Sequence, residues 1–239
     1  MSTQYQQLDG LDFDGVGETL LVDKPLDWSS FDVIRYIKKK YNIKKIGHAG
    51  TLDPKATGLL IICTGKKTKA VNSYVGLEKE YRGVMELGIR TDSFDSEGKV
   101  VERRPYDCVT EQQIWDVQPQ FVGKIMQIPP MYSAVKFRGK PLYKLARKGR
   151  TVERQSKEIE VSQFEIVGIN KPMIEFRVVC SKGTYIRALV EDFGLALGCG
   201  ATLRGLRRTR IGHHDVADAV SIANLRMDER AMVHGIERQ

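Results

Sequence analysis

Long apolar runs are missing from this sequence of 239 residues. No stretch approaches the roughly 20 consecutive apolar residues that a membrane-spanning helix requires. The first residues are polar and mildly acidic, unlike a secretory signal or an Arg-rich transit peptide. We therefore expect a cytoplasmic protein without a membrane anchor, preceded by a flexible N-terminal leader over residues 1–17.

Clustered metal ligands and paired cysteines are also missing. The four cysteines are scattered and form no CxxC pair, and the four histidines lack the spacing of metal ligands. The sequence therefore predicts free thiols and no metal site. Internal repeats, low-complexity blocks and linkers are equally absent, which favours one compact domain over several.

Positive charge is plentiful: 38 Lys and Arg face 30 Asp and Glu, which gives a net charge of +8. The basic residues gather in clusters at 38–45, 136–154 and 204–210. The densest cluster holds eight of them against the single acid Glu153: Lys136, Arg138, Lys140, Lys144, Arg147, Lys148, Arg150 and Arg154. Most charge runs are simply solvated helix faces, but three clusters in one basic chain favour a polyphosphate partner such as RNA.

Strand and helix patterns are mixed along the chain without regular βαβ alternation. Alternating or continuous apolar residues predict strands near 19–25, 79–88, 156–169 and 173–183. Helical spacing predicts helices from Ser29 or Ser30 to Tyr41, with Phe31, Ile34 and Ile37 on one side, from Thr110 toward Phe121, and over 184–198. The fold class is therefore α+β, a mixed and mainly antiparallel central sheet flanked by helices. We expect one domain over 18–225, with an exposed basic insertion at 124–154 and a tail at 226–239.

The most unusual segment is the glycine-punctuated loop expected over 46–58, which contains Asp53 followed by Pro54. Three glycines within it, Gly47, Gly50 and Gly58, allow tight turns and close approach to a ligand. Asp–Pro is also a common helix start, with the aspartate as N-cap and the proline at the first helical position. The local sequence thus leaves two interpretations open, a cap and a reactive carboxylate.

The block KKIGHAGTLDPKATGLLIICTGKKTK (44–69) resembles the signature of the TruB family, the tRNA pseudouridine-55 synthases. Three further blocks resemble the same family in the same order, at 79–98, 128–154 and 180–212, so that the resemblance covers about residues 19 to 212. It implies the pseudouridine synthase fold and isomerisation of a T-loop uridine of tRNA without a cofactor. Asp53 corresponds to the catalytic aspartate. Its carboxylate could add to ribose C1′ or uracil C6, or assist removal of the C2′ proton en route to a glycal.

The resemblance also assigns the residues that surround the reacting base. Tyr81 corresponds to the tyrosine that stacks on the flipped base and is a candidate for proton transfer. Tyr185 forms a wall of the base pocket, and Arg187 is the ion-pair partner that keeps Asp53 ionised. His48 contacts the region of the target nucleotide, and Leu206 is an apolar lid on the uracil. The residue types alone would also allow core packing or surface positions for each of them.

The basic insertion resembles the inserted thumb that grips the T arm, through Lys136, Arg138, Lys140, Lys144, Arg147, Lys148 and Arg150. Only 27 residues follow Gly212, too few for the PUA-type domain that many relatives carry, so we expect a short form of the family. No obligate protein partner is expected. A tRNA chaperone without catalysis and a synthase acting on ribosomal or messenger RNA are the alternatives.

Overall fold

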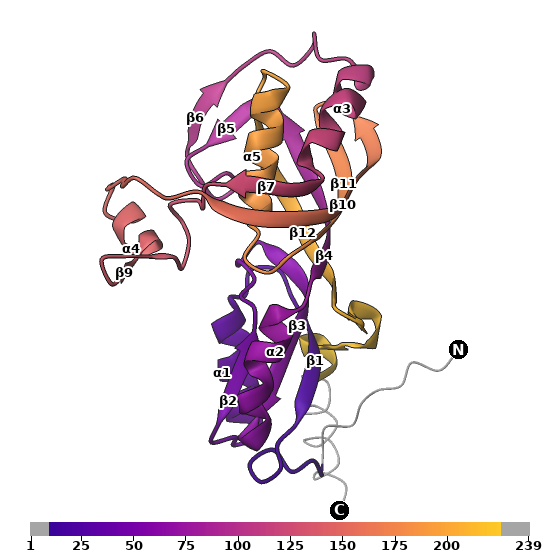
Figure 1. Ribbon diagram of the computed structural model, residues 1–239. Helices are drawn as coiled ribbons and strands as arrows, with labels where there is room; N and C mark the ends of the chain where they lie inside the picture. Colours follow the sequence, from indigo (N-terminus) through magenta and orange to yellow (C-terminus); the bar gives the residue numbers. More distant parts are fainter. Residues whose placement is uncertain (1–9, 226–239) are drawn as a thin grey trace, which may run out of the picture. The chain divides into compact units, whose positions relative to one another are not determined.

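The structure is a computed structural model that describes residues 10–225 of the chain (Figure 1). The chain divides into two compact units. The first is formed by residues 1–79 together with 207–239, and the second by residues 80–206. Whether the two units act as the single domain expected over 18–225 stays a prediction, and the expected tail at 226–239 lies outside the described residues.

The sheet of the first unit has the strand order β14-β1-β3-β12. β1 (Thr19–Lys24) is antiparallel to β3 (Ala56–Thr64) and parallel to the short β14 (Val220–Ser221). β2 (Ile46–Ala49) is antiparallel to the far end of β3, and β13 (His214–Asp215) is antiparallel to β12 (Ala201–Ile211), whose residues from Arg207 onward belong to this unit. Helical segments accompany these strands: α1 (Ser30–Lys40), η1 (Gly65–Ala70), α2 (Val71–Gly76) and η3 (Val216–Asp218).

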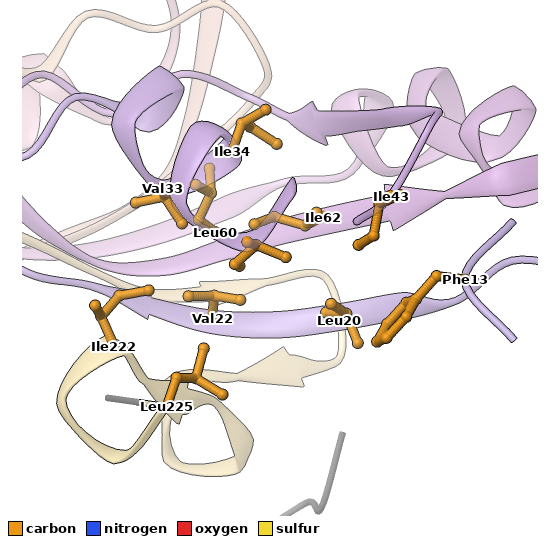
Figure 2. Close-up of a cluster of buried hydrophobic side chains, with 11 residues drawn as sticks. Phe13, Leu20, Val22, Val33, Ile34, Ile43, Leu60, Ile62, Ile222 and Leu225 are labelled. Carbon is orange, nitrogen blue, oxygen red and sulfur yellow. The ribbon is translucent and has the colours of Figure 1, made fainter. Parts of the chain in front are cut away.

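Helix α1 begins at a capping box on Ser29, one of the two predicted N-cap candidates. The Ser29 hydroxyl accepts from the Asp32 amide, and the Asp32 carboxylate accepts from the Ser29 amide. The buried face of α1 packs with β1 and β3 in one apolar cluster, shown in Figure 2. The buried apolar residues of this face are Val33, Ile34 and Ile37, whereas Phe31 is 61% exposed. The prediction that Phe31 shares this face is wrong, because successive helix positions are about 100° apart and Phe31, two positions before Val33, lies on nearly the opposite side of the helix from it.

The described part of the expected leader, residues 10–17, is anchored by Phe13 and Gly17, and its other residues are exposed. Phe13 is buried in the same cluster (Figure 2), and its ring centroid lies 5.1 Å from that of Tyr41. The Asp12 carboxylate accepts from the amides of Gly15 and Val16, which closes a turn. The polar composition concealed this one apolar anchor. Residues 1–9 lie outside the described part.

The sheet of the second unit has the order β12-β4-β11-β10-β7. β10 (Lys157–Asn170) is antiparallel to both β11 (Met173–Cys180) and β7 (Gly123–Gln127), and β4 (Lys79–Leu87) buries alternate residues as expected. Helix α5 (Ile186–Ala196) packs on this sheet through Phe193, whose ring centroid lies 5.6 Å from that of Phe164 on β10. Around it lie α3 (Glu111–Val117), η2 (Gln118–Phe121) and the pair β5 (Ile89–Thr91) and β6 (Val100–Arg103).

The α+β class with a mainly antiparallel sheet is confirmed. The glycine-rich loop is shorter than predicted, because Ile46–Ala49 pair with Ile61–Thr64 as strands and only residues 50–55 remain between β2 and β3. Within residues 10–225, no helix is long and apolar enough to cross a membrane.

Candidate active site

Asp53 lies in the short loop between β2 and β3 (residues 50–55). We call it the catalytic loop after the role that the sequence resemblance implies for Asp53. Ser30, in the first turn of α1, binds Leu52, the residue before Asp53. The Ser30 hydroxyl accepts from the Leu52 amide at 2.9 Å and donates to the Leu52 carbonyl at 3.2 Å. Both residues are almost fully buried. After Asp53 the chain enters β3, and no helix follows Pro54. The N-cap interpretation of Asp53 is therefore wrong.

Lys24, at the end of β1, holds the other side of the same loop. Its fully buried ammonium group donates to the carbonyls of Pro25, Trp28 and Pro54, at 2.8, 2.5 and 3.2 Å. Burial lowers the pKa of Lys24 to about 8, although the negative charge of Asp53 acts in the opposite direction. The loop thus has Leu52 and Pro54 fixed on either side of Asp53, next to a buried cation.

His48 lies on β2, paired with Ile62, and is partly buried. Burial lowers the pKa of its imidazole, and the nearby charge of Arg208 lowers that pKa further. We therefore expect His48 to be neutral at neutral pH, with one ring nitrogen able to donate and the other able to accept a hydrogen bond.

The second unit carries Tyr81, Tyr185 and Arg187. Tyr81 lies on β4 and is 9% exposed. Tyr185 is the residue before α5, and the Gln127 side chain holds it on both sides: Gln127 accepts from the Tyr185 amide at 2.8 Å and donates to its carbonyl at 3.1 Å. Gln127 is buried, and sequence reasoning missed it because a single glutamine at the end of a strand carries no pattern.

Arg187, in the first turn of α5, is 5% exposed. Its guanidinium donates to the carbonyls of Ser93 and Tyr132, at 3.1 and 2.9 Å, and lies 3.5 Å from the Asp95 carboxylate. Asp95 is another residue that the sequence reasoning missed, hidden in what was interpreted as turn chemistry. The ion pair expected between Arg187 and Asp53 joins residues of the two units and stays a prediction.

The basic cluster at 204–210 is not one phosphate-binding surface. Arg204 pairs with Glu86, Arg207 makes a two-pronged ion pair with Asp23, and Arg208 is buried. Leu206 lies between them on β12 and is partly buried, and its role as a lid stays a prediction.

The insertion at 124–154 contains a small structured element, which we call the basic hairpin (residues 136–150). β8 (Lys136–Phe137) and β9 (Lys140–Pro141) are joined by Arg138 and Gly139, both with positive φ, and are followed by α4 (Leu142–Ala146). Figure 1 shows it projecting from the rest of the second unit. All seven predicted RNA-binding side chains are exposed: Lys136, Arg138, Lys140, Lys144, Arg147, Lys148 and Arg150.

Comparison with known proteins adds independent findings. Residues 38–186 match the model of the TruB family pseudouridylate synthase (N terminal domain), and residues 187–235 match that of the tRNA pseudouridylate synthase B C-terminal domain. The chain is 49% identical to the tRNA pseudouridine synthase B of Chlorobium luteolum, covering 88% of this chain and 74% of the relative. With the protein of the same name from Clostridium tetani it shares 47% identity, covering 85% and 71%.

Solved structures show the same fold. A chain of a Cbf5-Nop10-Gar1 complex matches with a TM-score of 0.67 at 33% identity. A chain of an H/ACA RNP bound to a substrate RNA containing 2'-deoxyuridine matches with a TM-score of 0.64 at 30% identity. Each match covers 87% of this chain, which spans about half the length of those two chains, 53% and 51%.

Proposed function

Because the chain belongs to the TruB family of pseudouridylate synthases, we propose that it isomerises the T-loop uridine of transfer RNA to pseudouridine. The relatives that share about half of its residues are named for this activity on tRNA. We expect the enzyme to act in the cytoplasm on the T stem-loop, without an obligate protein partner and without a cofactor.

The reaction moves one bond and exchanges one proton. The glycosidic bond between N1 and C1′ breaks, a bond between C5 and C1′ forms, the proton on C5 is lost to solvent, and N1 takes up a proton. A carboxylate can serve as a nucleophile at C1′ or at C6, or as a base toward C2′. All three routes need one ionised carboxylate held at a fixed position, and we assign that part to Asp53.

The observation that carries this proposal is the way the catalytic loop is held. Ser30 fixes Leu52, Lys24 and the amide of Asp27 fix Pro54, and Asp53 stands between them. A misplacement of about 1 Å in a reacting group can cost about a hundredfold in rate, so such fixation is what a catalytic carboxylate requires.

The remaining assigned residues handle the RNA. The target base must leave the T-loop stack, which costs a few kcal/mol and is offset by contacts to the extruded nucleotide. We assign Tyr81, Tyr185 and Leu206 to the flipped base, His48 to the neighbouring backbone and Arg187 to Asp53. The basic hairpin, with its exposed side chains, would hold the phosphates of the T arm.

The test is tritium release from T-loop RNA labelled at uridine C5, with Asp53→Asn beside the wild type. We expect release by the wild type and a loss of at least about a thousandfold in Asp53→Asn, with RNA affinity within about threefold, because the variant loses only the reactive oxygen. The matched control is Asp107→Asn, which removes an exposed carboxylate of the second unit and should keep the wild-type rate.

Two outcomes would contradict the proposal. A folded wild type that binds the RNA but releases no tritium would indicate an RNA-binding protein, such as a tRNA chaperone, or a different target uridine. An active Asp53→Asn variant would remove Asp53 from the chemistry.

A further inference from the structure

Arg208 is among the largest fully buried side chains of the described residues, with 1% exposure. It lies on β12, in the part of that strand that belongs to the first unit. Its Nε donates to the carbonyl of Leu59 at 2.7 Å, and its Nη2 donates to the carbonyl of Gly50 at 3.1 Å. Both acceptors are main-chain oxygens, so these two bonds leave the positive charge of the guanidinium unneutralised.

The two acceptors flank the catalytic loop. Gly50 is the first residue after β2, and Leu59 lies near the beginning of β3. The pairing of β2 with β3 ends at Ala49 and Ile61, and beyond that point the main chain of Arg208 lies against Gly58. The Arg208 side chain therefore joins the two ends of the loop at the point where β12 replaces β2 beside β3.

The backbone around Arg208 leaves little freedom. Gly50 and Gly58 have φ of +90° and +103°, values that L-residues rarely adopt. A Cβ atom on Gly58 would lie 2.2 Å from the Arg208 carbonyl oxygen, and one on Gly50 would lie 3.5 Å from the guanidinium. The close approach of β12 and the placement of the guanidinium thus depend on each other.

The charge of Arg208 reaches the same group of side chains as Asp53. It lowers the pKa of His48 and that of Lys24, while the negative charge of Asp53 raises the pKa of Lys24. Asp53 and Arg208 therefore shift the pKa of the same neighbour, Lys24, in opposite directions. A buried positive charge in these surroundings favours the ionised form of the loop carboxylate.

We propose that Arg208 is a positioning residue for Asp53, which clasps the two ends of the catalytic loop and adds positive charge to the surroundings of the carboxylate. The proposal rests on the catalytic role of Asp53 proposed above. Arg208 is assigned no contact with the RNA, so its removal should slow the chemical step and leave binding intact.

The test compares Arg208→Lys and Arg208→Gln in the full chain. The rate of tritium release is measured in single turnovers at saturating RNA over roughly pH 5 to 9, together with the Kd for the RNA and the folded fraction by circular dichroism. The control is Arg90→Gln, which removes a mostly buried arginine of the second unit that binds Glu191 and Glu102. The other titratable side chains near the loop are unchanged in all variants: Lys24 of β1, His48 of β2, Asp27 and Lys55.

We expect Arg208→Lys to lower the rate about tenfold or more, because an ammonium cannot reach both carbonyls in the same geometry. The acidic side of its pH–rate profile should stay at the wild-type pH, because lysine keeps the positive charge. Arg208→Gln should lower the rate further and shift the acidic side of the profile to higher pH, because the carboxylate becomes harder to ionise. The Kd should stay within about threefold for both, and Arg90→Gln should retain the wild-type rate per folded molecule.

The proposal is overturned if folded Arg208→Gln keeps the wild-type rate and pH profile, or if its loss is only in Kd. It is also overturned if neither Arg208 variant folds while Arg90→Gln does, since the role is then purely structural. A wild type that releases no tritium would instead reject the proposed function, and with it the premise of this inference.

Discussion

The two compact units bury positive charge in different ways. In the first unit, Lys24 and Arg208 are fully buried and donate to main-chain carbonyls. In the second unit the partly buried Arg90 and Arg177 are held by carboxylates, Arg90 by Glu191 and Glu102, and Arg177 by Glu80 and Glu165. The buried Arg187 combines both arrangements, because it donates to two carbonyls and lies 3.5 Å from the Asp95 carboxylate.

This difference separates charge that acts on a reaction from charge that stabilises a fold. A carboxylate partner cancels most of the field of a buried cation, whereas a carbonyl satisfies its hydrogen bonds and leaves the net charge in place. In the role proposed above for Arg208, that remaining charge favours an ionised Asp53 carboxylate. Around Arg90 and Arg177 the charge is balanced locally, so we expect their ion pairs to matter for stability more than for catalysis.

Among the tests of this comparison, we expect the largest effect from Arg90→Gln, on the free energy of unfolding. Glu191 would keep its negative charge with a side chain only 4% exposed. Breaking a buried pair on one side costs about 3–5 kcal/mol of the free energy of unfolding. Because the Arg90 side chain is 25% exposed, we expect the lower end of that range, about 3 kcal/mol, measured by urea denaturation. Arg104→Gln is the control, because its exposed ion pair with Glu102 should be worth less than about 1 kcal/mol. A loss below about 1 kcal/mol for Arg90→Gln, or a slower rate per folded molecule, would contradict the division of roles.

The basic hairpin provides a third arrangement, positive charge exposed to solvent. Replacing Lys136, Arg138 and Lys140 together by Gln should weaken RNA binding about 10- to 100-fold at low salt. The slope of log K against the logarithm of the salt concentration should become shallower by about 2–3, because the number of released counterions scales with the number of phosphate contacts. The rate at saturating RNA should not change. The measurement is filter binding at several salt concentrations.

The control for the hairpin variant is the triple substitution of Lys99, Arg103 and Lys124 to Gln, which removes the same charge from exposed positions elsewhere in the second unit. Equal weakening by both triples would show that net charge, and not the hairpin, governs RNA affinity.

Local patterns predicted a large part of the fold. Each of the confirmed predictions rests on residues close together in the sequence. They are the helix N-caps at Ser29 and Thr110, the alternation along β4 and the helical spacing of α5. The family resemblance supplied the candidate site residues, Asp53 first among them.

Long-range hydrogen bonds to the main chain could not be predicted. Ser30 binds Leu52 across 22 positions and Arg208 binds Gly50 across 158. A carbonyl acceptor is present at every residue, so such a contact leaves no pattern of residue types. Arg208 in particular looked like part of a phosphate-binding run, since its neighbours Arg207 and Arg210 are also basic.

The smallest predicted effect concerns a partly buried acid of the second unit. Asp192 lies on α5 beside Glu191, and burial together with that neighbouring charge raises its pKa to about 6. Its pKa in the unfolded chain is lower, so the folded state binds more protons between about pH 4 and 6. The free energy of unfolding therefore falls as pH rises through this window and stays lower above it.

Asp192→Asn has no charge to desolvate, so it should match the wild type near pH 4 and exceed it at pH 7. We expect a gain of about 1 kcal/mol, reduced from the full value of the pKa shift because the side chain is partly exposed. Thermal unfolding at both pH values measures this, with the exposed Asp116→Asn as a control that should behave alike at both. A variant that is equally or less stable at pH 7 would mean that Asp192 has a stabilising partner, and that acids in this unit are balanced as completely as its arginines.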